Sequence, residues 1–320
     1  MSETQTKSLD EIKFVFSVPR FLDGEITLEK GNVNIIMGRK KTLALTLMYN
    51  LINDELGSAE YYANDILDSR DFKAEMTVSV SSHGVTKTLV CNKLETENAV
   101  CNTVNDVDLN AIYFPTNVIA LSKIILPIVF AEARWEKFLD AVHDALDNVN
   151  TEYPVPVDKN VVPERLTIED DVIHIERSGI KRRYSIESDS ALKLSILATL
   201  MEKGVLRDPE QTILLFDEYE AGMHPRDMLK YAYLLMLLAR AMYTVVVATD
   251  SVDFVTMLTR PNGVLRTLGI SDIKITRLPT LHVIFEDGRI EEYSVVSSAV
   301  PTYTSVYLDV IKKEDVFVEK

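Results

Sequence analysis

One short stretch constrains the fold more than any other, because it runs four apolar residues directly into two carboxylates. Ile213 to Phe216 are apolar, and Asp217 and Glu218 follow at once. A continuous apolar run of this length is typical of a strand buried on both faces of a parallel sheet. A buried carboxylate is costly unless a cation pairs with it. The two acids therefore indicate either a ligand crevice, which open α/β sheets form at the carboxyl ends of their strands, or two solvated acids at a strand-to-loop junction.

The residues around this acidic pair resemble a nucleotide-binding motif. Residues 216–225 read Phe-Asp-Glu-Tyr-Glu-Ala-Gly-Met-His-Pro. They are similar to the Walker B and D-loop segment of ATP-binding-cassette (ABC) type ATPases, in particular the branch with RecF, SMC-like and OLD-family proteins. Tyr219 departs from the family's Pro and Met223 from its Leu. The resemblance implies ATP and Mg²⁺ as cofactors, Asp217 as a metal residue, and Glu218 as the catalytic base that positions or deprotonates the attacking water.

A strand, a basic turn and a helix near the N-terminus form the second part of the expected site. Val33 to Met37 is apolar and predicts a buried strand, and residues 43–52 predict a buried helix. Backbone N–H groups at a helix N-terminus bind anions, and a lysine adds a point charge. A full phosphate-binding loop has about four residues between two glycines before its Lys and Ser or Thr. The turn here lacks the second glycine and is about three residues shorter than that motif.

The resemblance to ABC-type heads places this turn at the phosphates. It implies that Lys41 is the phosphate lysine and that Thr42 supplies a hydroxyl to Mg²⁺. Gly38, Arg39 and Lys40 would complete the cofactor-binding turn. The alternative, from the residues alone, is a tight strand-to-helix turn with a solvated basic cluster.

Two further family motifs occur in altered form. Ser188 and Ser190 precede a predicted helix over residues 192–202, where family members carry a Ser-Gly signature that contacts the γ-phosphate bound by the opposing subunit. Ala191 stands in place of the glycine, and a helix N-cap explains the same residues without a ligand. Asp250 occupies the position of the family's histidine that contacts the γ-phosphate. An aspartate cannot be a cationic sensor, but it could bind water or metal.

The remaining patterns complete the expected fold. Antiparallel hairpins are predicted at three places: residues 73–93, residues 172–186 and around Asp287-Gly288. Helices are predicted over residues 121–149 and 226–242. The resemblance implies an α/β, ABC-ATPase-like P-loop fold with a mostly parallel core sheet, an antiparallel β-subdomain and a short helical insertion. We expect a single composite domain over residues 1–320, with the insertion at about 116–152 and a Pro-rich linker at about 152–164.

Composition limits the class of partner. The chain has 320 residues and a net charge of −15, which indicates an ample core and argues against a surface coated in basic residues for DNA. A local basic groove stays open, although Lys181, Arg182 and Arg183 more often form a solvated strand edge. The most apolar segment, residues 231–248, contains Arg240 and is interpreted as a core helix and strand, so we expect no membrane span.

The cysteines and the N-terminus bear on the compartment. Cys91 and Cys101 have no metal-ligand spacing, and we expect two buried or half-buried thiols in a reducing environment. The N-terminal residues are polar and do not resemble a signal peptide. Both patterns favour a cytoplasmic location.

Two functions of different classes agree with these patterns. The first is a magnesium-dependent ATPase that dimerises around nucleotide, as a homodimer or with a partner protein, in DNA maintenance or defence, with nucleic acid as an open possibility. The second is a pseudo-ATPase that keeps the fold as an interaction scaffold. The intact Asp217-Glu218 pair favours the first. The shortened turn, the altered signature and Asp250 favour the second.

Overall fold

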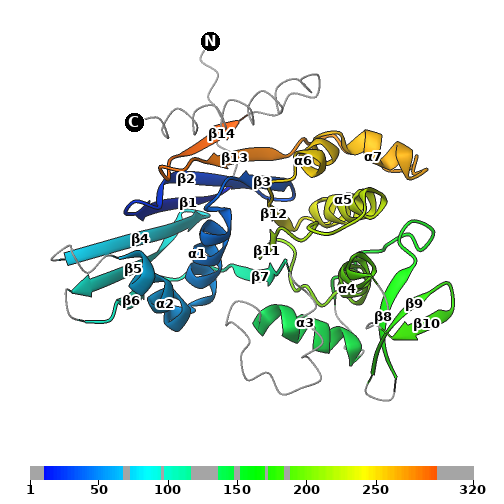
Figure 1. The fold of residues 1–320 in the computed structure, drawn as a ribbon, viewed down its shortest axis with the longest axis horizontal. Helices are drawn as coiled ribbons and strands as arrows, with labels where there is room; N and C mark the ends of the chain where they lie inside the picture. Colours follow the sequence, from blue (N-terminus) through cyan, green and yellow to red (C-terminus); the bar gives the residue numbers. More distant parts are fainter. Residues whose placement is uncertain are drawn as a thin grey trace, which may run out of the picture.

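The structure is a computed structural model that describes residues 11–67, 73–94, 97–116, 136–147, 152–169, 172–183 and 188–293. These residues form an α/β fold with three sheets, and helices pack on both faces of the central one (Figure 1). Among the described helices, none combines the length and the apolar character needed to cross a membrane.

The central sheet has six strands in the order β14-β13-β3-β12-β11-β7. Its strands are β3 (Val33–Met37), β7 (Asn110–Phe114), β11 (Thr212–Asp217), β12 (Thr244–Ala248), β13 (Thr280–Ile284) and β14 (Ile290–Tyr293). Neighbouring strands from β13 to β7 are parallel, and β14 joins the edge of β13 in antiparallel orientation. The predicted mostly parallel core sheet and the hairpin around Asp287-Gly288 are therefore confirmed.

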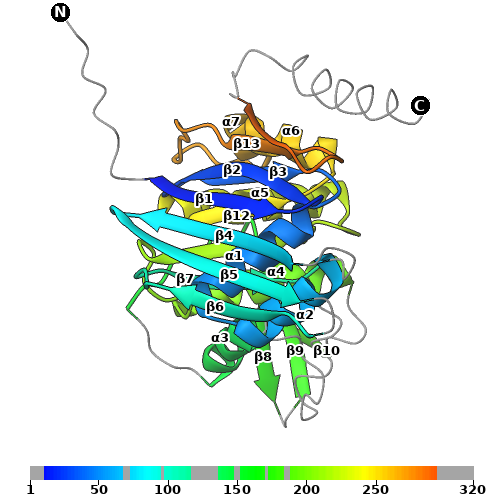
Figure 2. The same cartoon turned by 90° about the vertical axis from the view of Figure 1, so that its left-hand side faces the viewer.

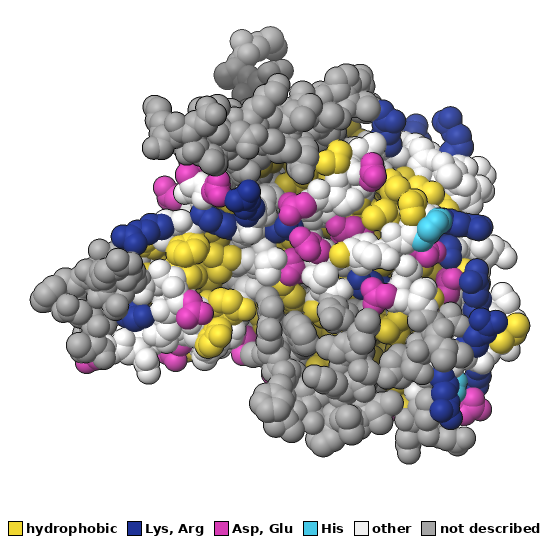
Figure 3. Space-filling model, in the orientation of Figure 1, with side chains coloured by type: hydrophobic (Ala, Val, Ile, Leu, Met, Phe, Trp, Pro, Cys, Tyr) yellow, Lys and Arg dark blue, Asp and Glu magenta, His cyan; other side chains and the backbone are white. Residues whose placement is uncertain are grey.

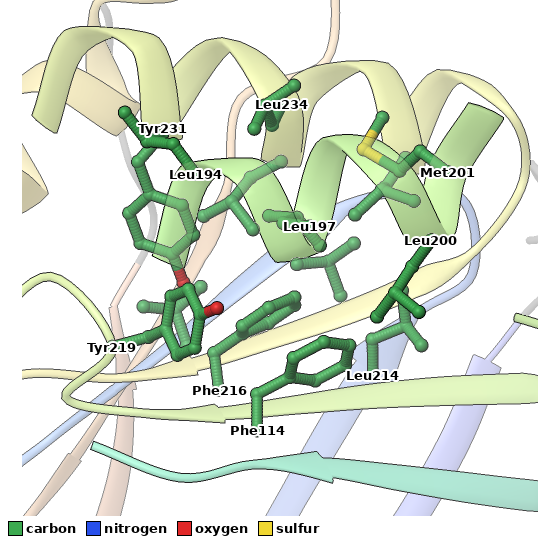
Figure 4. Packing of buried hydrophobic residues seen from close by; sticks show 14 of the residues in the cluster. Phe114, Leu194, Leu197, Leu200, Met201, Leu214, Phe216, Tyr219, Tyr231 and Leu234 are labelled. Atoms are coloured by element: carbon green, nitrogen blue, oxygen red, sulfur yellow. The ribbon is translucent and has the colours of Figure 1, made fainter. Parts of the chain in front are cut away.

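Alternate residues of the central strands enter two separate apolar cores, as expected for strands buried on both faces. In β11, Leu214 and Phe216 face one core, while Ile213 and Leu215 face the other. Helices α4 (Asp189–Lys203), α5 (Pro225–Arg240), α6 (Val252–Thr259) and α7 (Pro261–Thr267) cover the first face, and α1 (Lys41–Asn53) covers the second. On the first face Phe216 stacks on Phe114 with ring centroids 4.3 Å apart, beneath leucines of α4 (Figure 4).

The second core is closed by a five-stranded antiparallel sheet in the order β2-β1-β4-β5-β6. Its strands are β1 (Glu11–Val18), β2 (Leu22–Glu29), β4 (Lys73–Ser82), β5 (Val85–Leu94) and β6 (Val100–Val104), and α2 (Leu56–Ile66) packs against β5 and β6 (Figure 2). The predicted hairpin over residues 73–93 is confirmed. Its turn uses His83 and Gly84, which both have positive φ, as type I′ two-residue hairpin turns require.

The expectation of two free thiols is wrong, because Cys91 and Cys101 form a disulfide. They lie directly opposite each other on β5 and β6, with Cα atoms 4.1 Å apart. Side chains of such a cross-strand pair are close enough to bond. The spacing in the sequence does not reveal this, because the pairing depends on β6, which the pattern did not predict.

A third, smaller sheet lies at the far end of the first core. It has the order β10-β9-β8, from β8 (Glu164–Glu169), β9 (Val172–Arg177) and β10 (Ile180–Arg183), so the second predicted hairpin is confirmed and gains a third strand. Within the expected helical insertion the structure describes α3 (Glu136–Leu146). Residues 117–135, which include the first part of the helix predicted over residues 121–149, lie outside the described residues. In α3, Phe138, Leu139, Val142 and Leu146 are buried in the first core, so the apolar face expected for this helix is confirmed there.

Charge is distributed unevenly over the surface. In Figure 3, acidic side chains gather near the middle of the face shown, and lysine and arginine follow its right-hand edge. Exposed cations of β9 and β10 include Arg177, Lys181 and Arg183. Lys181 is paired with Glu169 at 3.4 Å, and Arg177 lies 3.7 Å from Glu164. These pairs favour a solvated strand edge, which the sequence pattern also indicated.

Candidate functional site

Three adjacent parallel strands bring the predicted site residues to one edge of the central sheet. Lys41 and Thr42 begin α1 after the short turn that follows β3, Asp217 ends β11, and Asp250 follows β12, which lies between β3 and β11. Open α/β sheets bind ligands in the crevice outside the carboxyl ends of their strands. The fold therefore places the candidate residues where a ligand site is expected.

Lys41 is the cation at the centre of this edge. Its side chain is 5% exposed, and its Nζ donates to Glu218 Oε1 at 2.8 Å and to Asp250 Oδ2. Burial lowers the pKa of Lys41, but the hydrogen bonds and charges of Asp250 and Glu218 outweigh this and hold the pKa above its ordinary value. Lys41 is therefore a charged lysine whose positive charge is already shared by two carboxylates.

Asp217 is held by hydroxyl groups on both sides. Thr42 Oγ1 donates to Asp217 Oδ1 at 2.9 Å, and the Tyr113 hydroxyl of β7 donates to Asp217 Oδ2 at 2.6 Å. Asp217 is 6% exposed, and Tyr113 is 1% exposed. The predicted contact between the acidic pair and Lys41-Thr42 is confirmed. Tyr113 is an additional site residue that the sequence did not reveal, because its position depends on the pairing of β7 with β11.

The turn between β3 and α1 is tight and requires glycine at its first position. Gly38 has φ +114°, and a Cβ there would lie 2.0 Å from the carbonyl oxygen of Ile284. The N–H of Gly38 donates to Asp250 Oδ1 at 3.3 Å. Asp250 therefore accepts hydrogen bonds from a backbone amide of the turn and from Lys41, which are the two kinds of donor that a phosphate would use.

Arg39 and Lys40 lie in the same turn but contact a different loop. Arg39 Nη1 is 2.7 Å from Glu286 Oε1, and Lys40 Nζ donates to the carbonyl oxygens of Arg20 and Glu286. Burial lowers the pKa of Lys40, although Asp287 and Glu286 partly oppose this. In this conformation both side chains tie the turn to the β13–β14 hairpin, and Lys41 is the turn cation that meets the acidic pair.

The backbone at Glu218 adopts an uncommon conformation. Its φ is 45°, in the left-handed region that costs a residue with a side chain about 1–2 kcal/mol. The N–H of Glu218 donates to Ala248 O at 2.9 Å, which continues the contact between β11 and β12 by one residue. The Glu218 side chain is 38% exposed and reaches Lys41. Strained backbone of this kind is frequent where a functional side chain must be aimed.

A further acid, which is buried, lies two residues after Glu218 in the chain. Glu220 is 3% exposed and pairs with the Thr249 hydroxyl through Oε1, whereas its Oε2 is buried without a partner among the described residues. Burial raises the pKa of Glu220, and the Thr249 hydrogen bond opposes this in part. Neither residue was singled out from the sequence, since burial of Glu220 follows from packing.

The serines of the altered signature belong to the N-terminus of α4. Ser188 is its N-cap, and its Oγ accepts from the N–H of Ala191 at 3.2 Å, so the N-cap interpretation is confirmed. Ser190 is 5% exposed. Lys193, in the next turn, is 1% exposed and donates to the carbonyl oxygen of Ala221 at 2.9 Å. The Tyr219 hydroxyl donates to Lys193 O at 3.0 Å, so the signature region is attached to the turn that follows β11.

The oxygen atoms of Thr42 and Asp217 fit a small divalent cation. Two ligands at neighbouring corners of a Mg²⁺ octahedron, each about 2.1 Å from the ion, are about 3.0 Å apart. Thr42 Oγ1 and Asp217 Oδ1 are joined by a hydrogen bond of 2.9 Å, a separation that two neighbouring Mg²⁺ ligands would also have. No group of three or more His, Cys, Asp or Glu among the described residues could hold a metal ion. Mg²⁺ commonly takes few protein ligands and completes its shell with phosphate oxygens and water.

Comparisons with known proteins give likenesses of fold. No protein-family model matches the chain, and no curated protein matches it. Similar solved structures include the SMC head domain from Thermotoga maritima, at 10% identity over 89% of this chain and 100% of that chain, with a TM-score of 0.43. An SMC head bound to the C-winged helix domain of ScpA matches at 10% identity over 90% of this chain and 98% of that chain, with a TM-score of 0.49.

A nucleotide-free ATP-binding cassette from an ABC transporter matches at 12% identity over 94% of this chain and 98% of that chain, with a TM-score of 0.46. Because each TM-score is below 0.5, function has to be inferred from the contacts of the site.

Proposed function

We propose that the chain binds ATP with Mg²⁺ at this edge of the central sheet and hydrolyses it slowly. One observation carries the proposal. Lys41 and Thr42, from the start of α1, meet Glu218 and Asp217, from the end of β11, across a separation of about 175 residues. A buried cation, a hydroxyl and two carboxylates at the carboxyl ends of parallel strands are the groups that phosphoryl-transfer sites of this layout use.

Each residue has a role that its contacts support. Lys41 would hold the β- and γ-phosphates, and Thr42 and Asp217 would hold Mg²⁺, which neutralises charge on the phosphates. The Tyr113 hydroxyl orients Asp217 by occupying its second oxygen. Glu218 would position and deprotonate the attacking water. Since Glu218 is paired with Lys41, movement of Lys41 toward phosphate would release the carboxylate for this role.

Slow turnover is expected because two carboxylates already contact the Lys41 ammonium group. Asp250 and Glu218 both contact its Nζ, and Asp250 also accepts from the N–H of Gly38. Bound phosphate would have to displace the Asp250 carboxylate and tolerate its negative charge. In addition, Arg39 and Lys40 contact Glu286 rather than the acidic pair. We therefore expect weak nucleotide binding, and slow turnover at ATP concentrations below the dissociation constant.

The second candidate is a pseudo-ATPase that acts as an interaction scaffold. The specific observation in its favour is the same Asp250 contact, because a carboxylate that permanently neutralises Lys41 would stabilise the fold without nucleotide. In that case the Lys41, Glu218 and Asp250 group is a structural ion network.

Measured turnover separates the two candidates. Phosphate release from Mg·ATP should be slow in the wild type and reduced about 10²-fold or more in Glu218→Gln, the usual contribution of a positioned base. Glu210→Gln is the matched control, because Glu210 is exposed and lies outside the site. No phosphate release above background in the wild type would leave the scaffold as the better account, and an equal measurable rate in Glu218→Gln would contradict the role of Glu218 as the base.

We further propose that nucleotide promotes association with a second copy or a partner protein through the N-terminal region of α4, where Ser188 and Ser190 lie. A setting in DNA maintenance or defence would agree with this. Light scattering of Glu218→Gln with and without Mg·ATP tests the homodimer. An unchanged mass at saturating nucleotide would contradict it and favour a different partner.

A further inference from the structure

A cavity of about 310 Å³ lies at the opposite end of the central sheet from Lys41. It is bounded by the beginning of β3 at Val33, the end of α5 at Arg240, and the irregular segment of residues 274–279 that leads into β13. β3 runs from Val33 at the cavity to the Gly38 turn at the candidate phosphate site. The cavity is therefore distinct from the proposed nucleotide site.

The wall formed by the core is apolar. Val33, Met236 and Leu258 line the cavity with side chains that are otherwise buried. Met242 also lines it and is 44% exposed, which makes it one of the large hydrophobic side chains that the fold leaves open to solvent. Methionine is unbranched and polarisable, so it adapts to an apolar ligand. This wall can therefore accept the body of an organic molecule.

The other wall and the rim are cationic. Arg240, Lys274 and Arg277 line the cavity, and its lining contains no acidic residue. This sign is opposite to that of the whole chain, which has a net charge of −15. Arg240 and Lys274 are exposed, and within the described part of the chain neither makes an ion pair. Their charges are available to an anion.

Hydrogen bonds hold the irregular wall in place. The Asn262 side chain bonds both the N–H and the carbonyl of Ile275, at 3.2 and 3.0 Å. Asn32 Nδ2 donates to Leu278 O at 2.9 Å, and Arg277 Nη1 donates to Lys30 O at 3.1 Å. Asn32 Nδ2 also donates to the carboxylate of Glu29, an acid near this wall, at 2.7 Å. The cavity is thus preformed, which lowers the entropy cost of binding.

We propose that this cavity is a binding site for a small amphipathic anion, a carboxylate with an apolar body of about eight to twelve carbon atoms, since ligand pockets begin at about 300 Å³. The apolar body would contact Met236, Leu258 and Met242. The carboxylate would lie between Arg240 and Lys274. The proposal does not depend on nucleotide binding at Lys41.

Displacement of a fluorescent probe tests the chemistry of the ligand. The probe is 8-anilinonaphthalene-1-sulfonate, an aromatic anion, titrated into the full-length protein. We expect saturable binding that octanoate displaces, with octanol at least about tenfold weaker because it lacks the charge-assisted bonds to the cations. ATP should not displace the probe, and Lys41→Ala should bind it as the wild type does. Equal displacement by octanol and octanoate, or displacement by ATP, would overturn the proposal.

Paired substitutions test its location. Arg240→Ala with Lys274→Ala should weaken octanoate about tenfold or more and leave octanol unchanged. Lys181→Ala with Arg183→Ala removes the same charge from exposed positions on β10 and should leave both unchanged. Because all four side chains are exposed, the variants should keep the wild-type melting temperature, which is measured alongside. Octanoate affinity that is unaffected by Arg240→Ala with Lys274→Ala, or that falls equally in the control, would overturn the assignment to this cavity.

Discussion

Asp250 is predicted to weaken ATP binding, and Asp250→Asn should therefore bind ATP more tightly than the wild type. The Asp250 carboxylate contacts Lys41 Nζ through one oxygen and the N–H of Gly38 through the other. Asparagine has nearly the same shape but no negative charge. It would release Lys41 from one of its two carboxylates and would remove repulsion toward phosphate.

The expected change in ATP affinity depends on how far solvent screens the Lys41–Asp250 pair. Two unit charges about 4 Å apart interact by about 4 kcal/mol at the effective dielectric near a protein surface. Exposed pairs are measured at about 0.2–1 kcal/mol. Lys41 is 5% exposed and Asp250 is 51% exposed, so the pair lies between these cases. We take about 1–2 kcal/mol, which corresponds to ATP affinity that is about 5–30-fold tighter in Asp250→Asn.

Calorimetric titration of Mg·ATP into the two proteins measures this difference directly. Asp253→Asn is the matched control, since Asp253 carries the same charge three residues further on and is exposed in the first turn of α6. The control should change ATP affinity by less than about twofold, as expected for a screened surface charge. If Asp250→Asn binds ATP as weakly as the wild type, or more weakly, Asp250 does not compete with phosphate and the reasoning is refuted.

Three further predictions concern stability. Burial raises the pKa of Glu220, so the folded protein holds the carboxyl proton more tightly than the unfolded chain and loses stability as pH rises through the raised pKa. Glu220→Gln should therefore raise the melting temperature more at pH 8 than at pH 5. An equal rise at both pH values would contradict this. Burial lowers the pKa of His282 to about 4, so stability should fall by up to about 3 kcal/mol as pH drops from 6.5 toward 4, and by less in His282→Gln in denaturant titrations. The Cys91–Cys101 disulfide spans a sequence separation of 10, and its reduction should lower the free energy of unfolding by about 3 kcal/mol, or the melting temperature by about 4 °C. An unchanged melting temperature in protein that mass spectrometry shows to be reduced would contradict this.

Much of the frame of the site could be predicted from the sequence. The apolar run before Asp217 predicts a strand buried on both faces, and β11 has that position. The pattern around Gly38 predicts the strand and helix that it joins. These features are local, because they depend on the period of apolar residues and on turn chemistry. The meeting of Lys41 with Glu218 then follows from the parallel order of β3, β12 and β11.

The remaining features depend on contacts between distant segments. Tyr113 reaches Asp217 because β7 pairs with β11, and nothing in the residues near Tyr113 indicates that pairing. Arg39 points away from the acidic pair because the hairpin that carries Glu286 lies beside the turn. The resemblance placed Asp250 only at the position of a γ-phosphate histidine, as a residue that could bind water or metal. Its ion pair with Lys41 was not predicted, because it depends on the packed structure.

The central claim is that Lys41 is the residue through which this chain binds nucleotide. Thermal unfolding with Mg·ATP at a hundred times its dissociation constant tests it most directly, because binding then contributes about 2.7 kcal/mol, or about 4 °C for a chain of this length. The wild type and the exposed control Lys159→Ala should show this shift, and Lys41→Ala should lose it. A shift of equal size in Lys41→Ala, or no shift in the wild type with any nucleotide, would contradict the claim.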